Sequence, residues 1–170
     1  MNLLLVALRL VHVVLGVLWV GTVVFTAAYL TPAIQDTGPD GAKVMAALQR
    51  RGIMTVLPIL AFGTLLSGIW LYWRGSAGFQ GGYLTSPVGL AFGLGGVASL
   101  LAYALGITVM RPAMLRAVAL AQAAGAATAE ERERRAGEIQ RLRARGAAAG
   151  RWVAMLLVAS VAAMAVARYL

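Results

Sequence analysis

The sequence predicts an all-α, polytopic integral membrane protein in which four transmembrane helices form a bundle with a cytoplasmic helical hairpin. Three observations predict this fold class. Of the 170 residues, 61% are hydrophobic and only 12% are charged, which is far from the composition of soluble domains. Four apolar segments are each long enough to cross a hydrocarbon core about 30 Å thick. Most of the basic residues lie in two of the segments that connect these spans.

The apolar segments set the predicted boundaries within a single membrane domain, residues 1–170. Thr31-Pro32 is expected to end the first span, because a residue that precedes proline disfavours helix. Pro58 is expected to kink the second span. Ser86 and Pro87 begin the third span, as a capping hydroxyl followed by proline at the first helical position. The predicted spans are residues 3–30, 53–73, 87–110 and 152–169, and the hairpin is the segment 112–150.

The distribution of charge predicts how the chain lies in the membrane. Nine arginines lie between the third and fourth spans and three basic residues lie in the first loop, whereas the middle loop carries only Arg74. Because positively charged loops stay in the cytoplasm, the loops 31–51 and 111–151 are predicted to be cytoplasmic and both termini to lie outside. One lysine against fourteen arginines is typical of a bacterial protein, so a bacterial cytoplasmic (inner) membrane is the expected location.

The net charge of +9 would suggest nucleic acid as the partner of a soluble protein. Here the charge sits beside membrane spans, where it sets orientation. The expected partner is therefore the lipid bilayer, and no nucleic-acid partner is expected. Cysteine is absent, which excludes a disulfide framework and thiolate metal sites.

The hairpin segment carries signals of a charged helix. Thr128 followed by Glu131 has the spacing of a capping box. Glu130 and Arg134, and likewise Glu131 and Arg135, have the i,i+4 spacing of helical ion pairs. A solvated helix that fixes the topology accounts for these features. Binding to anionic headgroups or to an acidic partner is the alternative.

The third span contains Gly89, Gly93 and Gly96. Gly89 and Gly93 form a small-xxx-small pair, which lets another helix approach closely. This glycine face is expected to serve tight packing within the chain, room for a flat cofactor, or the contact with a second copy or a partner membrane subunit. Five polar residues of the spans are expected to form hydrogen bonds between helices: Thr64, Ser67, Ser99, Tyr103 and Thr108.

The first span carries a cation and the only histidine of the chain. Arg9, His12, Gly16 and Trp19 fall on one helix face through i,i+3 and i,i+4 steps. A charged side chain inside a span costs about 2.5 kcal/mol or more on insertion scales. Arg9 and His12 therefore mark either a functional site or side chains that escape to the interface.

These are the residue types that a b-type haem requires. The imidazole of His12 is an iron ligand, Arg9 can pair with a propionate, and Gly16 lets the macrocycle approach the backbone above the flat ring of Trp19. The candidate cofactor is haem b, with His12 as the ligand of the haem iron. Two other interpretations stay open, because Arg9 can extend to the interface and His12 can hydrogen-bond a neighbouring helix.

Residues 10–21, LVHVVLGVLWVG, resemble the first-helix pattern, roughly LH-x-x-x-G-x-x-W-x-G, of several small bacterial membrane families. These include the copper-resistance protein D (CopD) superfamily, HemJ-type protoporphyrinogen oxidases and the membrane domain of PuuD-type urate oxidases. HemJ-type proteins are four-helix haem b proteins, so the resemblance implies that His12 is the axial ligand. They also use a lysine in a later helix, and none of the three later spans here contains lysine. The CopD family implies copper, for which the methionines show no tight pairing in sequence: Met54, Met110, Met155 and Met164.

Together these features favour a haem b protein that serves electron transfer or a membrane redox reaction, with no catalytic residue assigned. One alternative is a structural or interaction subunit of a larger membrane complex, without a cofactor. Another is a small copper or metal transporter of CopD type. Spans two to four contain no Asp, Glu, Lys or His, which disfavours proton-coupled transport.

Overall fold

The computed structural model describes residues 3–123 and 128–170, and their regular structure is entirely helical. Four helical segments are long and apolar enough to cross a membrane, which confirms the predicted fold class of an all-α membrane bundle. These segments are Leu3–Asp36, Ile53–Gly75, Pro87–Ala123 and Glu133–Tyr169.

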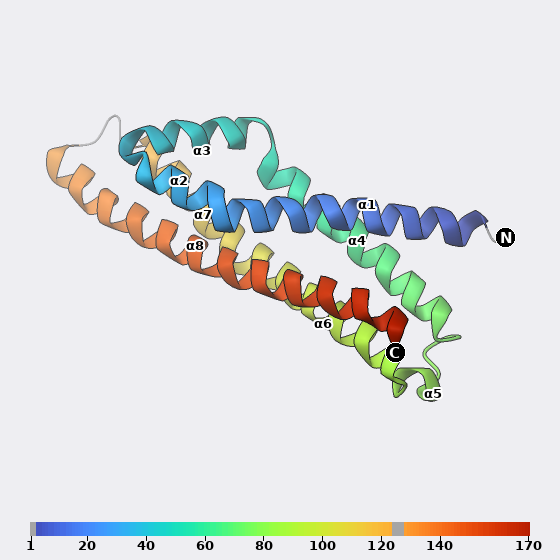
Figure 1. The fold of residues 1–170 in the computed structure, drawn as a ribbon. Helices are drawn as coiled ribbons and strands as arrows, with labels where there is room; N and C mark the ends of the chain where they lie inside the picture. The colour runs from blue at the N-terminus through green and yellow to red at the C-terminus, as the bar shows by residue number, and fades with distance from the viewer. Residues whose placement is uncertain (1–2, 124–127) are drawn as a thin grey trace.

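The elements follow one another as α1 (Leu3–Phe25), the π-helical η1 (Thr26–Leu30), α2 (Thr31–Asp36), η2 (Gly38–Asp40), α3 (Gly41–Arg50), α4 (Ile53–Gly75), α5 (Gly81–Leu84), α6 (Pro87–Leu105), the π-helical η3 (Gly106–Met110), α7 (Arg111–Ala123), α8 (Ala129–Val166) and η5 (Ala167–Tyr169). In space α1 packs on α4, α4 on α6, α6 on α8 and α8 on α1, so the four long helices form a closed ring. Both termini and α5 lie at one end of this bundle, and α2, α3 and the tip of the α7–α8 hairpin lie at the other (Figure 1).

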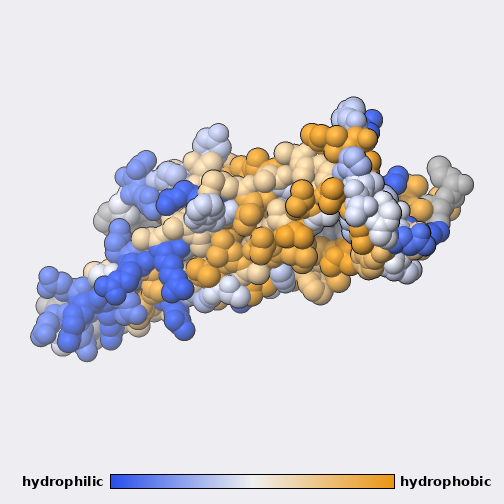
Figure 2. Space-filling view, turned by 90° about the horizontal axis from the view of Figure 1, so that it is seen from below, coloured by the Kyte–Doolittle hydropathy of each residue, from blue (hydrophilic) through white to orange (hydrophobic). Residues whose placement is uncertain are grey.

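The core of the bundle is small and most large apolar side chains point outward. Trp19, Val23 and Leu157 belong to the buried cluster at its centre. By contrast Val17 and Leu94 are about two-thirds exposed, at 66% and 67%. Figure 2 shows apolar side chains over the middle of the molecule and polar ones gathered at the hairpin end. Soluble monomers rarely expose apolar patches of this extent, and lipid is the solvent that covers them.

The prediction that the first span ends at Thr31-Pro32 is wrong, because the chain stays helical to Asp36. A π-turn, η1, precedes the proline, and the N–H of Thr31 donates to the carbonyl of Thr26, five residues back. In an α-helix the proline ring clashes with the carbonyl four residues earlier. The wider turn relieves that clash, so Pro32 lies in the first turn of α2 instead of ending the helix.

The third span passes a proline in the same way. There η3 precedes Pro112, and the N–H of Arg111 donates to the carbonyl of Gly106. The third span therefore continues into α7 instead of ending at Met110. Such single π-turns inside α-helices are rare, and here two of them lie at the same end of the bundle.

The hairpin is not a separate segment, because α8 runs without a break for 38 residues. The part of the predicted segment 112–150 that follows residue 128 thus shares one helix with the predicted span 152–169, while residues 112–123 belong to α7. Gly146 and Gly150 lie inside it and make room for α7. A Cβ added to Gly146 would lie 3.0 Å from the Cε of Met114, and one added to Gly150 would lie 3.5 Å from the Sδ of Met110.

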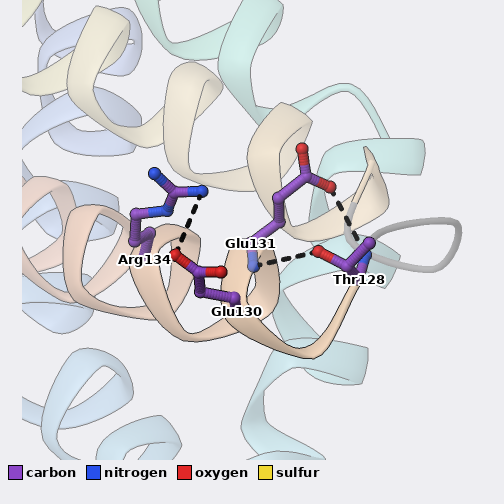
Figure 3. A network of polar contacts seen from close by, with 4 residues as sticks. All are labelled: Thr128, Glu130, Glu131 and Arg134. Atoms are coloured by element: carbon purple, nitrogen blue, oxygen red, sulfur yellow. Dashed lines mark hydrogen bonds and ion pairs between the residues drawn. The ribbon is translucent and has the colours of Figure 1, made fainter.

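The N-terminus of α8 has the predicted capping box (Figure 3). The N–H of Glu131 donates to Oγ1 of Thr128, and the N–H of Thr128 donates to Oε2 of Glu131, both at 3.3 Å. Arg134 lies 3.7 Å from Glu130, as its i,i+4 spacing predicts. The predicted pair of Glu131 and Arg135 does not form. The carboxylate of Glu131 instead accepts from the N–H of Thr128 in the capping box. Arg135 donates to the carbonyl of Ala123 at 2.8 Å.

The glycines of α6 serve contacts within the chain. A Cβ on Gly89 would overlap the backbone carbonyl of Tyr83, and one on Gly93 would lie 3.1 Å from the hydroxyl of Tyr72. Tyr72 in turn donates to the carbonyl of Gly89 at 3.0 Å. A Cβ on Gly96 meets nothing within 4 Å. Two of the three predicted face residues are therefore used for packing inside the bundle.

Buried hydroxyl groups join α6 to α8. The Oγ atoms of Ser99 and Ser160 lie 2.8 Å apart, and Ser160 donates to the carbonyl of Gly95 at 2.7 Å. Of the other predicted interhelical groups, Thr108 donates to the carbonyl of Ala104 in its own helical segment. Tyr103 lines the cavity described below.

Candidate functional site

The imidazole of His12 lies in the contact between α1 and α4. Its Nδ1 is 2.9 Å from the carbonyl oxygen of Thr64 and 3.3 Å from Oγ of Ser67. A carbonyl oxygen only accepts, so the proton of a neutral ring is assigned to Nδ1, which donates to Thr64. Nε2 then carries the lone pair. The hydrogen bond thus selects the tautomer in which Nε2 can act as a ligand.

The partners of His12 are themselves held in place. Thr64 and Ser67 are buried, with exposed fractions of 7% and 6%. The hydroxyl of Thr64 donates to the carbonyl of Leu60 at 2.8 Å, and that of Ser67 to the carbonyl of Gly63 at 2.7 Å. These hydroxyls donate within α4, so the acceptors that α4 offers to Nδ1 of His12 are the carbonyl of Thr64 at 2.9 Å and the oxygen of the Ser67 hydroxyl at 3.3 Å. The shorter contact, to the backbone carbonyl, orients the ring of His12.

Glycines of α4 make the space for this contact. A Cβ on Gly68 would lie 2.7 Å from Cε1 of His12, and one on Gly63 would lie 2.7 Å from Cδ1 of Leu15. On α1, a Cβ on Gly16 would lie at an ordinary 3.5 Å from Cγ2 of Thr64. Gly16 therefore faces α4, whereas the prediction gave it the role of admitting the macrocycle, and Gly68 is the residue that clears room for the imidazole.

Thr64 and Ser67 were expected as interhelical hydrogen-bonding groups, but their pairing with His12 and the roles of Gly63 and Gly68 were missed, although a signal for these residues exists in the sequence. Gly63 and Ser67, and likewise Thr64 and Gly68, are small residues four apart. Two offset small-xxx-small pairs on one helix indicate a closely approached face. That pattern predicts a partner helix without saying which one it is.

Neither of the remaining two predicted site residues forms a hydrogen bond with His12. Arg9 is exposed on α1, one turn nearer the N-terminus, and it forms no ion pair or hydrogen bond with any residue that the structure describes. Trp19 is buried at 4% exposure in the bundle core. Seven residues of helix separate it from His12, about 10 Å along the axis. Trp19 therefore packs the core and does not flank the imidazole.

The cavity inside the bundle has a volume of about 50 Å³ and is lined by Trp19, Tyr103 and Arg111, and not by His12. Pockets that enclose organic ligands usually measure about 300 Å³ or more, so this space does not fit a haem. The donor chemistry of His12 does fit one, with Nδ1 engaged and Nε2 available. Since His12 is half-buried, a haem bound there would lie against the outer surface of α1 and α4.

The same cavity is lined by Met54 and Met110, two methionines that are far apart in the sequence. Thioether sulfur is a soft ligand that suits Cu(I). The guanidinium of Arg111 lines the cavity as well, and its positive charge opposes a bound cation. This arrangement disfavours a copper site between the two methionines.

Comparisons with models of known protein families, with curated proteins and with solved structures give no match. The chemistry of His12 and its contacts on α4 is therefore the basis on which a function can be proposed.

Proposed function

We propose that this protein binds haem b through Nε2 of His12 and serves electron transfer or a redox reaction in a bacterial cytoplasmic membrane. The observation that carries the proposal is the hydrogen bond from Nδ1 of His12 to the carbonyl of Thr64. Histidines that ligate metals almost always donate their other ring N–H to a carbonyl, a carboxylate or water, which fixes the tautomer and strengthens the ligand.

The neighbouring residues have roles that suit this ligand. Arg9 is an exposed cation one helical turn away, placed to pair with a propionate. The absence of a side chain at Gly68 keeps the imidazole close to α4. A bound haem supplies an iron that exchanges one electron, while the protein supplies ligand, orientation and charge.

The proposed orientation puts the arginine-rich end of the bundle in the cytoplasm. The α7–α8 hairpin and α3 lie at one end of the molecule, and the two termini lie at the other (Figure 1). This common placement supports the assignment by the positive-inside rule. His12 then lies in the outer half of the membrane, nearer to an extracytoplasmic electron donor or acceptor than to a cytoplasmic one.

The first test is the absorption spectrum of the purified protein, oxidised and then reduced with dithionite. We expect a Soret band and sharpened α and β bands on reduction. His12→Ala should abolish these bands. His12→Gln should abolish them too while keeping an amide donor for the carbonyl of Thr64, so its thermal stability should stay near wild type. Arg9→Gln should lower the haem retained, and Arg74→Gln, an exposed arginine at the same end of the bundle, should not.

A haem spectrum that is unchanged in both His12 variants would contradict the assignment of His12 as the ligand.

A second candidate function is a subunit without cofactor, in which His12 holds α1 against α4. Its hydrogen bond to Thr64 and the small volume of the bundle cavity favour this candidate. A colourless protein after expression with ample haem would establish it, provided that His12→Ala then weakens the fold.

A further inference from the structure

Pro58 leaves an unpaired carbonyl inside α4, and a distant arginine supplies the missing donor. In an α-helix the carbonyl of Met54 would accept from the N–H of residue 58, but proline has none. Nε of Arg111, at the start of α7, donates to this carbonyl at 3.1 Å. The hydrogen bond fixes the position of the guanidinium beside α4.

The other donors of Arg111 have no acceptor among the described residues. Nε is engaged, which leaves the N–H groups of Nη1 and Nη2. Asp40 pairs with Lys43, Glu130 with Arg134, and no carboxylate of the described chain lies within ion-pair distance of Arg111. Because Arg111 is half-buried, its charge is partly removed from water, and a bound counter-charge would stabilise it.

Arg111 lies at the end of an apolar run and beside a small recess. It is the first charged residue after the apolar run 87–110. It also lines the cavity of about 50 Å³, whose other walls include the apolar Trp19, Pro58 and Ile107. The site therefore offers a fixed cationic fork beside a small apolar recess, at the end of a long apolar run.

We propose that Arg111 binds the phosphate of an anionic phospholipid, whose adjoining apolar part enters the recess between α1, α4 and α6. The planar fork of the guanidinium matches two phosphate oxygens. Pro58 has a positive role in this site, because the carbonyl that it frees holds the guanidinium in position. The site is independent of haem at His12, so either proposal can fail without the other.

Native mass spectrometry tests the site by measuring which lipid the protein retains. The protein is first exchanged into equal amounts of phosphatidylglycerol and phosphatidylcholine. Wild type should retain one phosphatidylglycerol molecule, and Arg111→Gln should lose it, with affinity lowered about tenfold to a hundredfold because charge-assisted hydrogen bonds are lost. Arg116→Gln removes an exposed charge from the same helix and should leave retention unchanged.

Pro58→Ala separates lipid binding from stability. It restores an N–H for the carbonyl of Met54, so the Pro58→Ala/Arg111→Gln double variant should be as stable as Pro58→Ala alone and yet should not retain the lipid. Retention of phosphatidylglycerol by the double variant at the level of wild type would overturn the proposal. Equal retention of phosphatidylcholine by wild type would overturn the preference for anionic lipid. Displacement of the lipid by excess inorganic phosphate would instead indicate a site for soluble phosphate.

Discussion

A single missing Cβ decides how closely α1 approaches α4. At Gly68 a methyl group would meet the imidazole of His12, whereas at Gly96 it would meet nothing within 4 Å. Both residues are glycines inside predicted spans, and the sequence does not distinguish them. The distinction depends on which face of each helix turns toward a neighbour, and that is settled by the packing of the whole bundle.

The contrast between these glycines is testable. Gly68→Ala should destabilise the protein by about 1 to 3 kcal/mol, because overpacking displaces the ring of His12 from the carbonyl of Thr64. Gly96→Ala should leave stability near wild type. Unfolding in mixed detergent micelles measures both variants. Equal effects of the two substitutions would contradict the close packing of α4 against His12.

The candidate site was predictable in part from the residues of one helix. The periodicity of α1 correctly groups His12 with Gly16, and it correctly allows a hydrogen bond from His12 to another helix. It places Trp19 on the same face, but the structure assigns that side chain to the core. Periodicity shows which residues share a face of a helix, but it does not show which residue of another helix each of them contacts. The carbonyl of Thr64 could therefore not be identified as the acceptor for His12.

Whole elements show a different balance between local and long-range effects. The caps at Ser86 and Thr128 are local, and both form as predicted. Thr31-Pro32 is also a local signal, and it fails, because a π-turn lets the helix pass the proline. Local rules state what a residue prefers in isolation. Packing along the full length of a neighbouring helix can outweigh that preference.

The cap of α8 gives a prediction at this scale. Thr128→Ala removes the acceptor for the N–H of Glu131 and should cost about 0.5 to 2 kcal/mol, confined to the first turns of the helix. Faster hydrogen exchange there, with unchanged exchange in the membrane half, is the expected result. Gln140→Ala, an exposed position farther along the same helix, serves as the control. Equal exchange in Thr128→Ala and wild type would show that the capping box does not stabilise the tip.

The whole molecule presents a broad apolar surface and a polar, arginine-rich end (Figure 2). Hydropathy predicted the four spans because lipid contact requires an unbroken apolar run. It did not predict that the third and fourth apolar runs continue into the polar parts of α7 and α8 as unbroken helical segments, since those polar parts suggested a separate hairpin.

The orientation of the bundle can be tested directly, because the chain contains no cysteine. Gln80→Cys lies in the connection between α4 and α5, and Gln140→Cys lies in the polar half of α8; both positions are exposed. An impermeant maleimide should label Gln80→Cys in intact cells and Gln140→Cys only after the membrane is opened. The reverse pattern would invert the proposed topology.

The unbroken course of α8 has a mechanical consequence. A helix of 38 residues is about 57 Å long, and it reaches from the capped tip at Thr128 to the hydroxyl contact of Ser160 with α6. No hinge interrupts it at Gly146 or Gly150. A tilt of the capped tip would therefore be transmitted along α8 and would appear at Ser160 as a shear between α8 and α6.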